Sequence, residues 1–153
     1  MKMAHRWKHW PLAIVLGMAV ATGSVDAAVS CHKINAKGSG QDLGNGATRA
    51  SIIGGGLLQG TTAGQFSITG FNPPVASIQG TVTFTTNQGM AVVTVAGVFD
   101  TSTGEFSASG PVTSGAGKLS GASGNLALHG VEDLTTGAFV EDVSGLLCVD
   151  LSP

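Results

Sequence analysis

Charged side chains are scarce in this chain, and the scarcity limits the partners it can take. Only 10% of the 153 residues are Asp, Glu, Lys or Arg, well below the roughly 25% of an average soluble domain. The formal net charge is −2, and basic residues cluster only at the N-terminus, as Lys2, Arg6 and Lys8. Since nucleic-acid binding needs a basic surface, the sequence predicts no nucleic-acid partner.

Aromatic side chains are also few. Tyr is absent, and both tryptophans, Trp7 and Trp10, lie in the first ten positions. The remaining aromatic residues are six phenylalanines. Outer-membrane barrels carry aromatic girdles at both interfaces, so the lack of Trp and Tyr beyond the N-terminus disfavours that class.

The first 27 residues have the three-part pattern of a secretory signal peptide. Basic residues precede an apolar stretch over residues 11–22, and small residues follow as far as Ala27. We place the cleavage after Ala27, with Ala28 as the second choice. A transmembrane anchor is the alternative, but about a dozen apolar residues are too few for a bilayer core of about 30 Å. The sequence predicts a secreted or periplasmic protein: residues 1–27 form the signal peptide and residues 28–153 a single domain without a membrane span.

Two cysteines, Cys31 and Cys148, lie near opposite ends of the expected mature domain. An exported chain reaches an oxidising compartment, where such a pair usually forms a disulfide. A redox-active pair is disfavoured because the chain has no Cys-x-x-Cys pattern. Lipidation of Cys31 is a competing interpretation, although residues 28–30 are a poor lipidation signal.

The mature region has almost no helical periodicity. Short runs of alternating apolar and polar residues take its place, as in residues 77–85 and 105–112, and Gly-containing turns separate them. This pattern indicates an all-β protein in which residues 36–48 form one long Gly-rich loop. The sequence predicts about eight strands, near residues 29–35, 49–58, 65–71, 75–86, 90–100, 105–113, 124–131 and 138–149.

Eight antiparallel strands can close into a small up-and-down β-barrel, which places the first strand beside the last. Cys31 and Cys148 would then be neighbours, so a closed barrel explains their positions. A β-sandwich could also bring the two ends of the domain together. We expect the barrel, since it accounts for the cysteines without further assumption.

A repeated segment predicts two tight turns. Residues 97–106 and 130–139 share the pattern Asp-x-x-Thr-Gly, in which Asp100 or Asp133 accepts hydrogen bonds from its own turn. One carboxylate per turn is too few for a calcium site. The spacing of His129, Glu132 and Asp133 fits no zinc pattern. The sequence therefore predicts neither a metal nor a cofactor.

Residues 115–128, GAGKLSGASGNLAL, are similar to a Gly-rich segment of the allene oxide cyclase-like and dirigent-like families. The resemblance implies an eight-stranded antiparallel barrel with an apolar cavity. It also implies a cyclase, or a protein that orients a reactive small molecule. No catalytic residue of those families can be mapped onto this chain. The matching positions are Gly115, Gly117, Leu119, Gly121, Ala122, Gly124, Leu126 and Leu128.

Strand alternation assigns nine apolar residues to the barrel interior or a ligand lining. Glu141 has the same parity as Phe139 and Val143, so regular alternation directs it inward as well. A buried carboxylate would have a raised pKa and could act as an acid or a base. A β-bulge or a place at the barrel rim would instead leave Glu141 in water. The nine apolar residues are Phe66, Ile68, Ile78, Val82, Phe84, Phe106, Leu126, Leu128 and Phe139.

Two functions of different classes follow from these observations. The scarcity of reactive side chains favours a non-catalytic barrel that binds a small apolar molecule or serves at the cell surface. The alternative is a cyclase or isomerase whose barrel shapes an apolar substrate, with Glu141 as the candidate catalytic residue. An open cavity that Glu141 reaches would distinguish them. The sequence specifies neither the ligand nor the oligomeric state.

The exported protein is expected to begin at Ala28 and to contain no free thiol before reduction. Intact mass spectrometry after thiol alkylation, with and without reductant, measures both properties. Two free thiols or a lipid adduct on Cys31 would contradict the disulfide.

Overall fold

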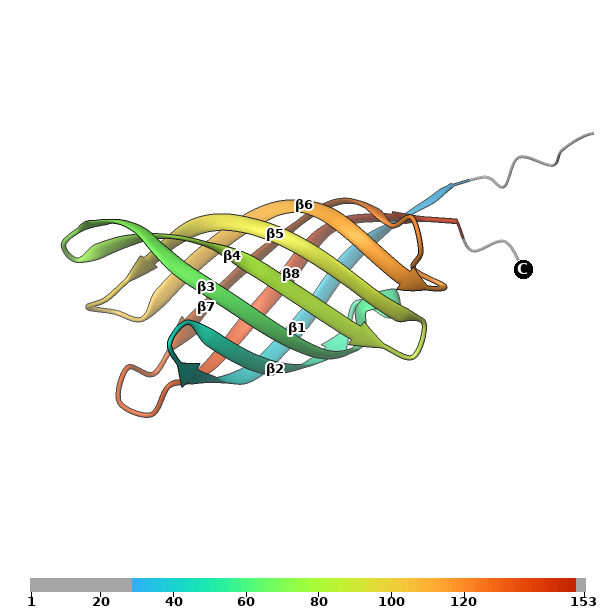
Figure 1. Ribbon diagram of the computed structural model, residues 1–153. Helices are drawn as coiled ribbons and strands as arrows, with labels where there is room; N and C mark the ends of the chain where they lie inside the picture. Colours follow the sequence, from blue (N-terminus) through green and yellow to red (C-terminus); the bar gives the residue numbers. More distant parts are fainter. Residues whose placement is uncertain (1–28, 151–153) are drawn as a thin grey trace, which may run out of the picture.

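The computed structural model describes residues 29–150, which form a closed barrel of eight antiparallel strands (Figure 1). Each strand pairs with its neighbours in the chain, and the last pairs with the first, as the sequence predicted. The expected signal peptide lies outside the described residues. The strands are β1 (Ser30–Gly44), β2 (Ala47–Gly54), β3 (Gly60–Asn72), β4 (Val75–Thr86), β5 (Gly89–Asp100), β6 (Glu105–Gly117), β7 (Ser123–Glu132) and β8 (Ala138–Val149).

The barrel is closed by the pairing of β1 with β8. This pairing runs without a register shift from Ser30 opposite Val149 to Gln41 opposite Ala138. Cys31 lies directly opposite Cys148, and a disulfide joins them across 117 positions of sequence. The predicted disulfide and the predicted closure are therefore confirmed together.

The prediction of a long Gly-rich loop over residues 36–48 is wrong. Strand β1 continues to Gly44, β2 begins at Ala47, and only a tight turn separates them. Asn45 and Gly46 adopt φ of 54° and 74° in this turn. Such left-handed angles are those of the Asn-Gly turns that join antiparallel strands.

The prediction failed because it took glycine as a loop signal where glycine instead makes room for a neighbour. Gly38 and Gly40 of β1 face the interior of the barrel. They pair with Glu141 and Phe139 of β8. A Cβ on Gly38 would lie 2.6 Å from Cγ of Glu141. A Cβ on Gly40 would lie 2.5 Å from Cζ of Phe139. Large inward side chains on β8 therefore require the small residues on β1.

Three other boundaries also differ from the prediction. The second strand stops at Gly54, and residues near its predicted end form a short 3₁₀ helix, η1 (Gly56–Leu58). The third strand begins at Gly60, and the sixth continues to Gly117. Leu58 is fully buried, so η1 folds inward and places an apolar side chain in the barrel.

The two repeated turns form as expected. The Asp100 carboxylate accepts hydrogen bonds from the backbone N–H groups of Ser102 and Thr103. The Asp133 carboxylate accepts the equivalent bonds from Thr135 and Thr136. The Ser102 hydroxyl also donates a hydrogen bond to Asp100 and contributes most to the lowered pKa of that carboxyl group, whereas at Asp133 the backbone bonds from Thr135 and Thr136 lower the pKa most. Both turns lie at the same end of the barrel.

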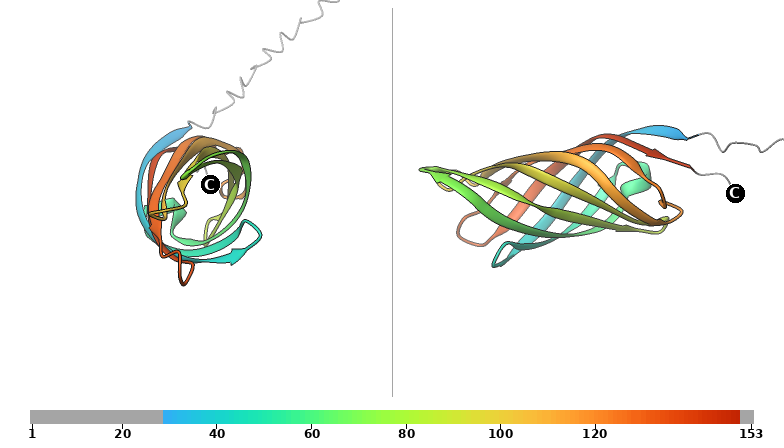
Figure 2. Two further views of the ribbon diagram at one scale, coloured as in Figure 1. Left: turned by 90° about the vertical axis from the view of Figure 1, so that its left-hand side faces the viewer. Right: turned by 45° about the horizontal axis from the view of Figure 1, so that its top comes forward.

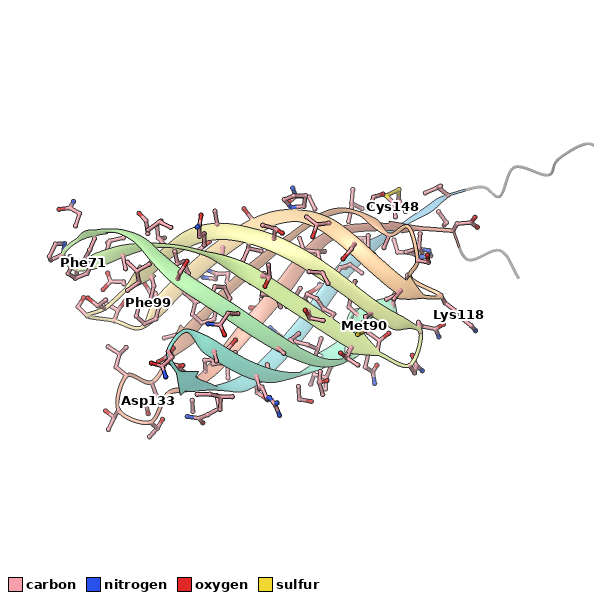
Figure 3. The ribbon with its side chains drawn as sticks, in the orientation of Figure 1. Phe71, Met90, Phe99, Lys118, Asp133 and Cys148 are labelled. Carbon is pink, nitrogen blue, oxygen red and sulfur yellow. A yellow bond between two sulfur atoms is a disulfide. The ribbon has the colours of Figure 1, made fainter. Side chains whose placement is uncertain are left out.

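We call that end the mouth. It consists of the β1–β2, β3–β4, β5–β6 and β7–β8 turns, and the end-on view shows the strands as a closed ring (Figure 2, left). Phe71, Phe99 and Asp133 lie toward the mouth in Figure 3. Met90, Lys118 and Cys148 lie toward the opposite end, which we call the closed end.

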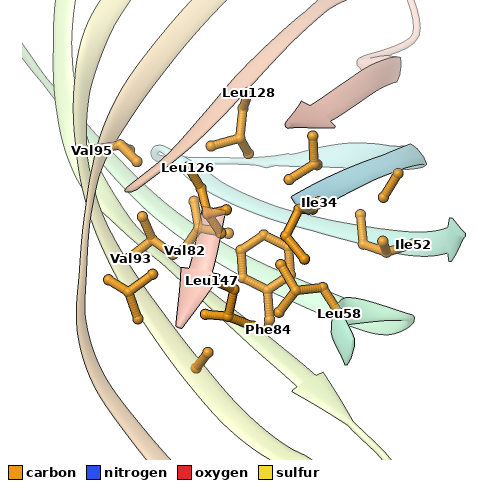
Figure 4. Close-up of a cluster of buried hydrophobic side chains, with 14 of the residues drawn as sticks. Ile34, Ile52, Leu58, Val82, Phe84, Val93, Val95, Leu126, Leu128 and Leu147 are labelled. Carbon is orange, nitrogen blue, oxygen red and sulfur yellow. The ribbon is translucent and has the colours of Figure 1, made fainter. Parts of the chain in front are cut away.

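The closed end is filled with apolar side chains (Figure 4). Phe84 of β4 is fully buried among residues of the other strands. Leu58 from η1 and Leu119 from the β6–β7 connection are fully buried as well. The packed cluster includes Ile34, Ile52, Leu58, Phe84, Val93, Leu119, Leu126 and Leu147.

Phe84→Ala is expected to destabilise the barrel far more than Thr85→Ala. Truncating a fully buried Phe typically costs about 3–5 kcal/mol because it leaves a cavity. Thr85 is the exposed neighbour on the same strand, and exposed substitutions usually change stability by no more than about 0.5 kcal/mol. Chemical denaturation of both variants provides the comparison, and equal midpoints would contradict the inward register of Phe84.

Candidate functional site

A cavity with a volume of about 440 Å³ occupies the mouth half of the barrel. Every strand contributes to its wall. Most of the wall is apolar, and it contains four of the six phenylalanines: Phe66, Phe99, Phe106 and Phe139. The barrel is thus packed at one end and hollow at the other.

The nine apolar residues assigned to the interior divide between these two regions. Phe84 and Leu126 belong to the packed closed end. Val82, Leu128 and Phe139 are buried and line the cavity. The half-buried residues Phe66, Ile78 and Phe106 also line it.

Ile68 departs from the expectation of an enclosed interior. Its side chain is 67% exposed, although it still borders the cavity. The β3–β4 pairing shifts register between Ile68 and Gly70, close to the mouth. The alternation that holds along the rest of β3 is interrupted there, which leaves Ile68 on the rim.

Glu141, the fourth residue of β8, points into the cavity. Strand β8 pairs in regular register with both β1 and β7 around this residue, so the bulge that would have turned it outward does not occur. Only 7% of its surface is exposed. It is therefore buried inside the barrel and does not lie on the wet rim.

Glycines flank Glu141 on both neighbouring strands, and Gly38 leaves the space that its side chain fills. Its partners across the sheet are Gly38 on β1 and Gly130 on β7. A Cβ on Gly38 would lie 2.7 Å from the Glu141 carboxylate oxygen Oε1. A Cβ on Gly130 would lie 2.6 Å from Cζ of Phe106, which packs edge-to-face on Phe139 with ring centroids 5.9 Å apart. Glu141 thus lies in a small niche beside two aromatic rings.

The carboxyl group of Glu141 has no partner in the described part of the chain. Within residues 29–150 no side chain or backbone group forms a hydrogen bond or an ion pair with it. Loss of hydration disfavours its charged form, and burial raises the pKa of Glu141 to about 7. The group can therefore carry or release a proton near neutral pH.

Two further carboxylates line the cavity nearer the mouth. Asp42 approaches from the end of β1, and Glu132 from the end of β7. Burial raises the pKa of Glu132, and the negative charge of Asp42 raises it further. None of the described residues that line the cavity is Lys, Arg or His.

Sequence reasoning missed several residues of this wall. Asp42 and Thr48 lay in or beside the predicted loop, so no strand parity was assigned to them. Glu132 enters the interpretation of the sequence only as a neighbour of His129. It has the same parity as Leu128, however, and faces inward with it. The parity of Glu132 could have predicted that it faces inward. An inward prediction for Asp42 would have needed the correct length of β1.

The Gly-rich segment over residues 115–128 contributes mainly to the closed end. Gly115 and Gly117 end β6, Leu119 and Ala122 are buried in the connection, and Leu126 is in the packed core. Most residues behind the family resemblance therefore form the floor of the barrel, whereas Leu128, the last of them, lines the cavity with the three carboxylates.

The chain was compared with protein-family models, with curated proteins and with solved structures, and it matches none of them. No helix within residues 29–150 is long and apolar enough to cross a bilayer.

Glu141→Gln is expected to make stability less dependent on pH. In wild type the folded pKa of Glu141, about 7, lies above the ordinary 4.5. Its stabilising contribution is complete below pH 4.5 and is lost as the pH rises toward 7. The difference in unfolding free energy, variant minus wild type, should increase from pH 5 to pH 8 by on the order of 2–3 kcal/mol.

Glu105→Gln is the matched control, because Glu105 is exposed on the outer face of β6. Urea denaturation of wild type and both variants at the two pH values gives the required differences. A pH-independent difference for Glu141→Gln would show that this carboxyl group is hydrated in the folded state.

Proposed function

We propose that this protein is an exported barrel that binds one small, largely apolar molecule in the cavity at its mouth. The observation that carries the proposal is an open, phenylalanine-lined cavity reached by Glu141, which is buried and has no partner among residues 29–150. Ligand pockets typically combine an apolar wall with a few polar groups that orient the ligand. This cavity has that composition.

The volume also supports a ligand site. Pockets for small molecules usually measure about 300–1,000 Å³, and the cavity volume of about 440 Å³ lies in that range. An eight-stranded barrel is just wide enough either to fill with side chains or to hold one small ligand. The apolar closed end provides a stable floor, so the mouth half can remain open.

Export is supported by the signal-peptide pattern of residues 1–27 and by the Cys31–Cys148 disulfide. Structural disulfides persist in oxidising compartments such as the bacterial periplasm or the extracellular space. The resemblance of residues 115–128 to allene oxide cyclase-like and dirigent-like barrels supports an apolar ligand of the kind those families handle.

A cyclase or isomerase is the second candidate, and the position of Glu141 favours it. A carboxyl group with a pKa near neutral can donate or accept a proton in a reaction. However, the other described carboxylates of the wall, Asp42 and Glu132, approach from the strand ends at the mouth. The arrangement gives one acid–base group at the depth of Glu141, which suits binding better than a two-step proton transfer.

Ala108→Trp is expected to abolish binding of the apolar fluorophore N-phenyl-1-naphthylamine. Ala108 is buried on the cavity wall opposite Gly97, so an indole at this position would project into the cavity. Ser109→Trp places the same side chain on the exposed outer face of β6 and should leave binding unchanged. Fluorescence titration measures the affinity, and circular dichroism verifies that both variants fold.

Equal binding by the two variants would place the fluorophore outside the barrel. No binding by wild type would contradict the proposed function.

A further inference from the structure

The charged groups that line the cavity restrict the charge of a ligand that can bind there. Asp42, Glu132 and Glu141 all line the wall, and no basic residue among the described ones lines it with them. Lys37, on the outer face of the same wall, forms an ion pair with Asp142. A negatively charged ligand would therefore meet only like charge inside the cavity.

The carboxyl group of Glu141 is the place in the cavity where a positive charge on a ligand would be stabilised. Only 7% of this residue's surface is exposed, and its side chain faces the cavity without a protein partner among residues 29–150. Buried charges in proteins are normally paired, because an unpaired charge loses its hydration without compensation. A cation brought by the ligand would provide the missing partner.

The aromatic residues beside Glu141 add a second, independent attraction. Phe139 precedes Glu141 by one inward position on β8, and Phe106 packs against Gly130, the β7 partner of Glu141. Aromatic faces attract cations within about 6 Å of the ring centroid. The surroundings of Glu141 thus combine one negative group with rings that favour a positive one.

We propose that the cavity is a site for a lipophilic cation, a molecule with one ammonium group on an apolar body. The ammonium group pairs with the Glu141 carboxylate, and the apolar body fills the phenylalanine-lined space. Asp42 and Glu132 at the mouth favour the entry of a cation over an anion. This inference rests on the proposed binding function and specifies its ligand class.

The charged groups around Glu141 define the expected pH dependence. Asp42 on β1 and Glu132 on β7 line the cavity with it, and no titratable side chain of β2 to β6 does so within the described chain. On the outer face of the wall are Lys37, Asp142, His129 and Glu105. A permanent cation binds the ionised carboxylate, so its affinity should rise by about 10- to 100-fold between pH 5 and pH 8, given a pKa of about 7.

The test compares three octyl compounds that differ in head-group charge. Calorimetric titration of wild type at pH 8 with octyltrimethylammonium, 1-octanol and octanoate should give the tightest binding for the ammonium ion and the weakest for octanoate. In Glu141→Gln the affinity for octyltrimethylammonium should fall by about tenfold or more, whereas the affinity for 1-octanol should change less than threefold. Glu105→Gln, on the outer face, should behave as wild type.

Several results would overturn this inference. Equal or tighter binding of 1-octanol or octanoate by wild type would remove the charge preference. If the fluorophore N-phenyl-1-naphthylamine still bound inside the barrel, the proposed function would survive that result. If neither the fluorophore nor any octyl compound bound, both proposals would fail. The pH dependence of octyltrimethylammonium binding to wild type tests the role of Glu141 without any variant, and a flat profile would also overturn it.

Discussion

The pairing of β1 with β8 joins the two ends of the sheet, and the closed barrel depends on it. This pairing leaves neither strand with an unpaired edge and places Cys31 opposite Cys148. Its register also sets Gly38 opposite Glu141. Because side chains alternate along a strand, a slip of one residue would turn Glu141 to the outside. The closure and the composition of the cavity are therefore set by one register.

The barrel is divided into a packed half and a hollow half. At the closed end, η1 and the β6–β7 connection fold inward and fill the interior with Leu58 and Leu119. At the mouth, tight turns stay outside the barrel and leave its interior open. Phe84 therefore contributes to stability, whereas Phe106 and Phe139 line the cavity. Glu141 also lines the hollow half, where its carboxylate has no partner among residues 29–150 and opposes folding at neutral pH. In the proposed function the bound molecule provides that partner.

Glycine was the main source of error in prediction from sequence. In residues 36–48 glycine indicated a loop, but Gly38 and Gly40 lie inside a strand because Glu141 and Phe139 of β8 fill the space that their side chains would need. That requirement comes from a strand about a hundred residues later, which a local pattern does not contain. The same error concealed Asp42, whose place on the cavity wall follows only from the full length of β1.

The amino-acid sequence was enough to predict the fold class, most strands from β4 onward, the two Asp-x-x-Thr-Gly turns and the cysteine pair. These features depend on local alternation, on turn chemistry or on the one pairing that two cysteines allow. It also gave Glu141 the right parity, without deciding between a bulge and a regular strand. The folded barrel was needed to answer that question, and to show which half is hollow and which carboxylates share the cavity. Space inside a barrel is set by cross-strand neighbours and inward-folding connections, and these are distant in sequence.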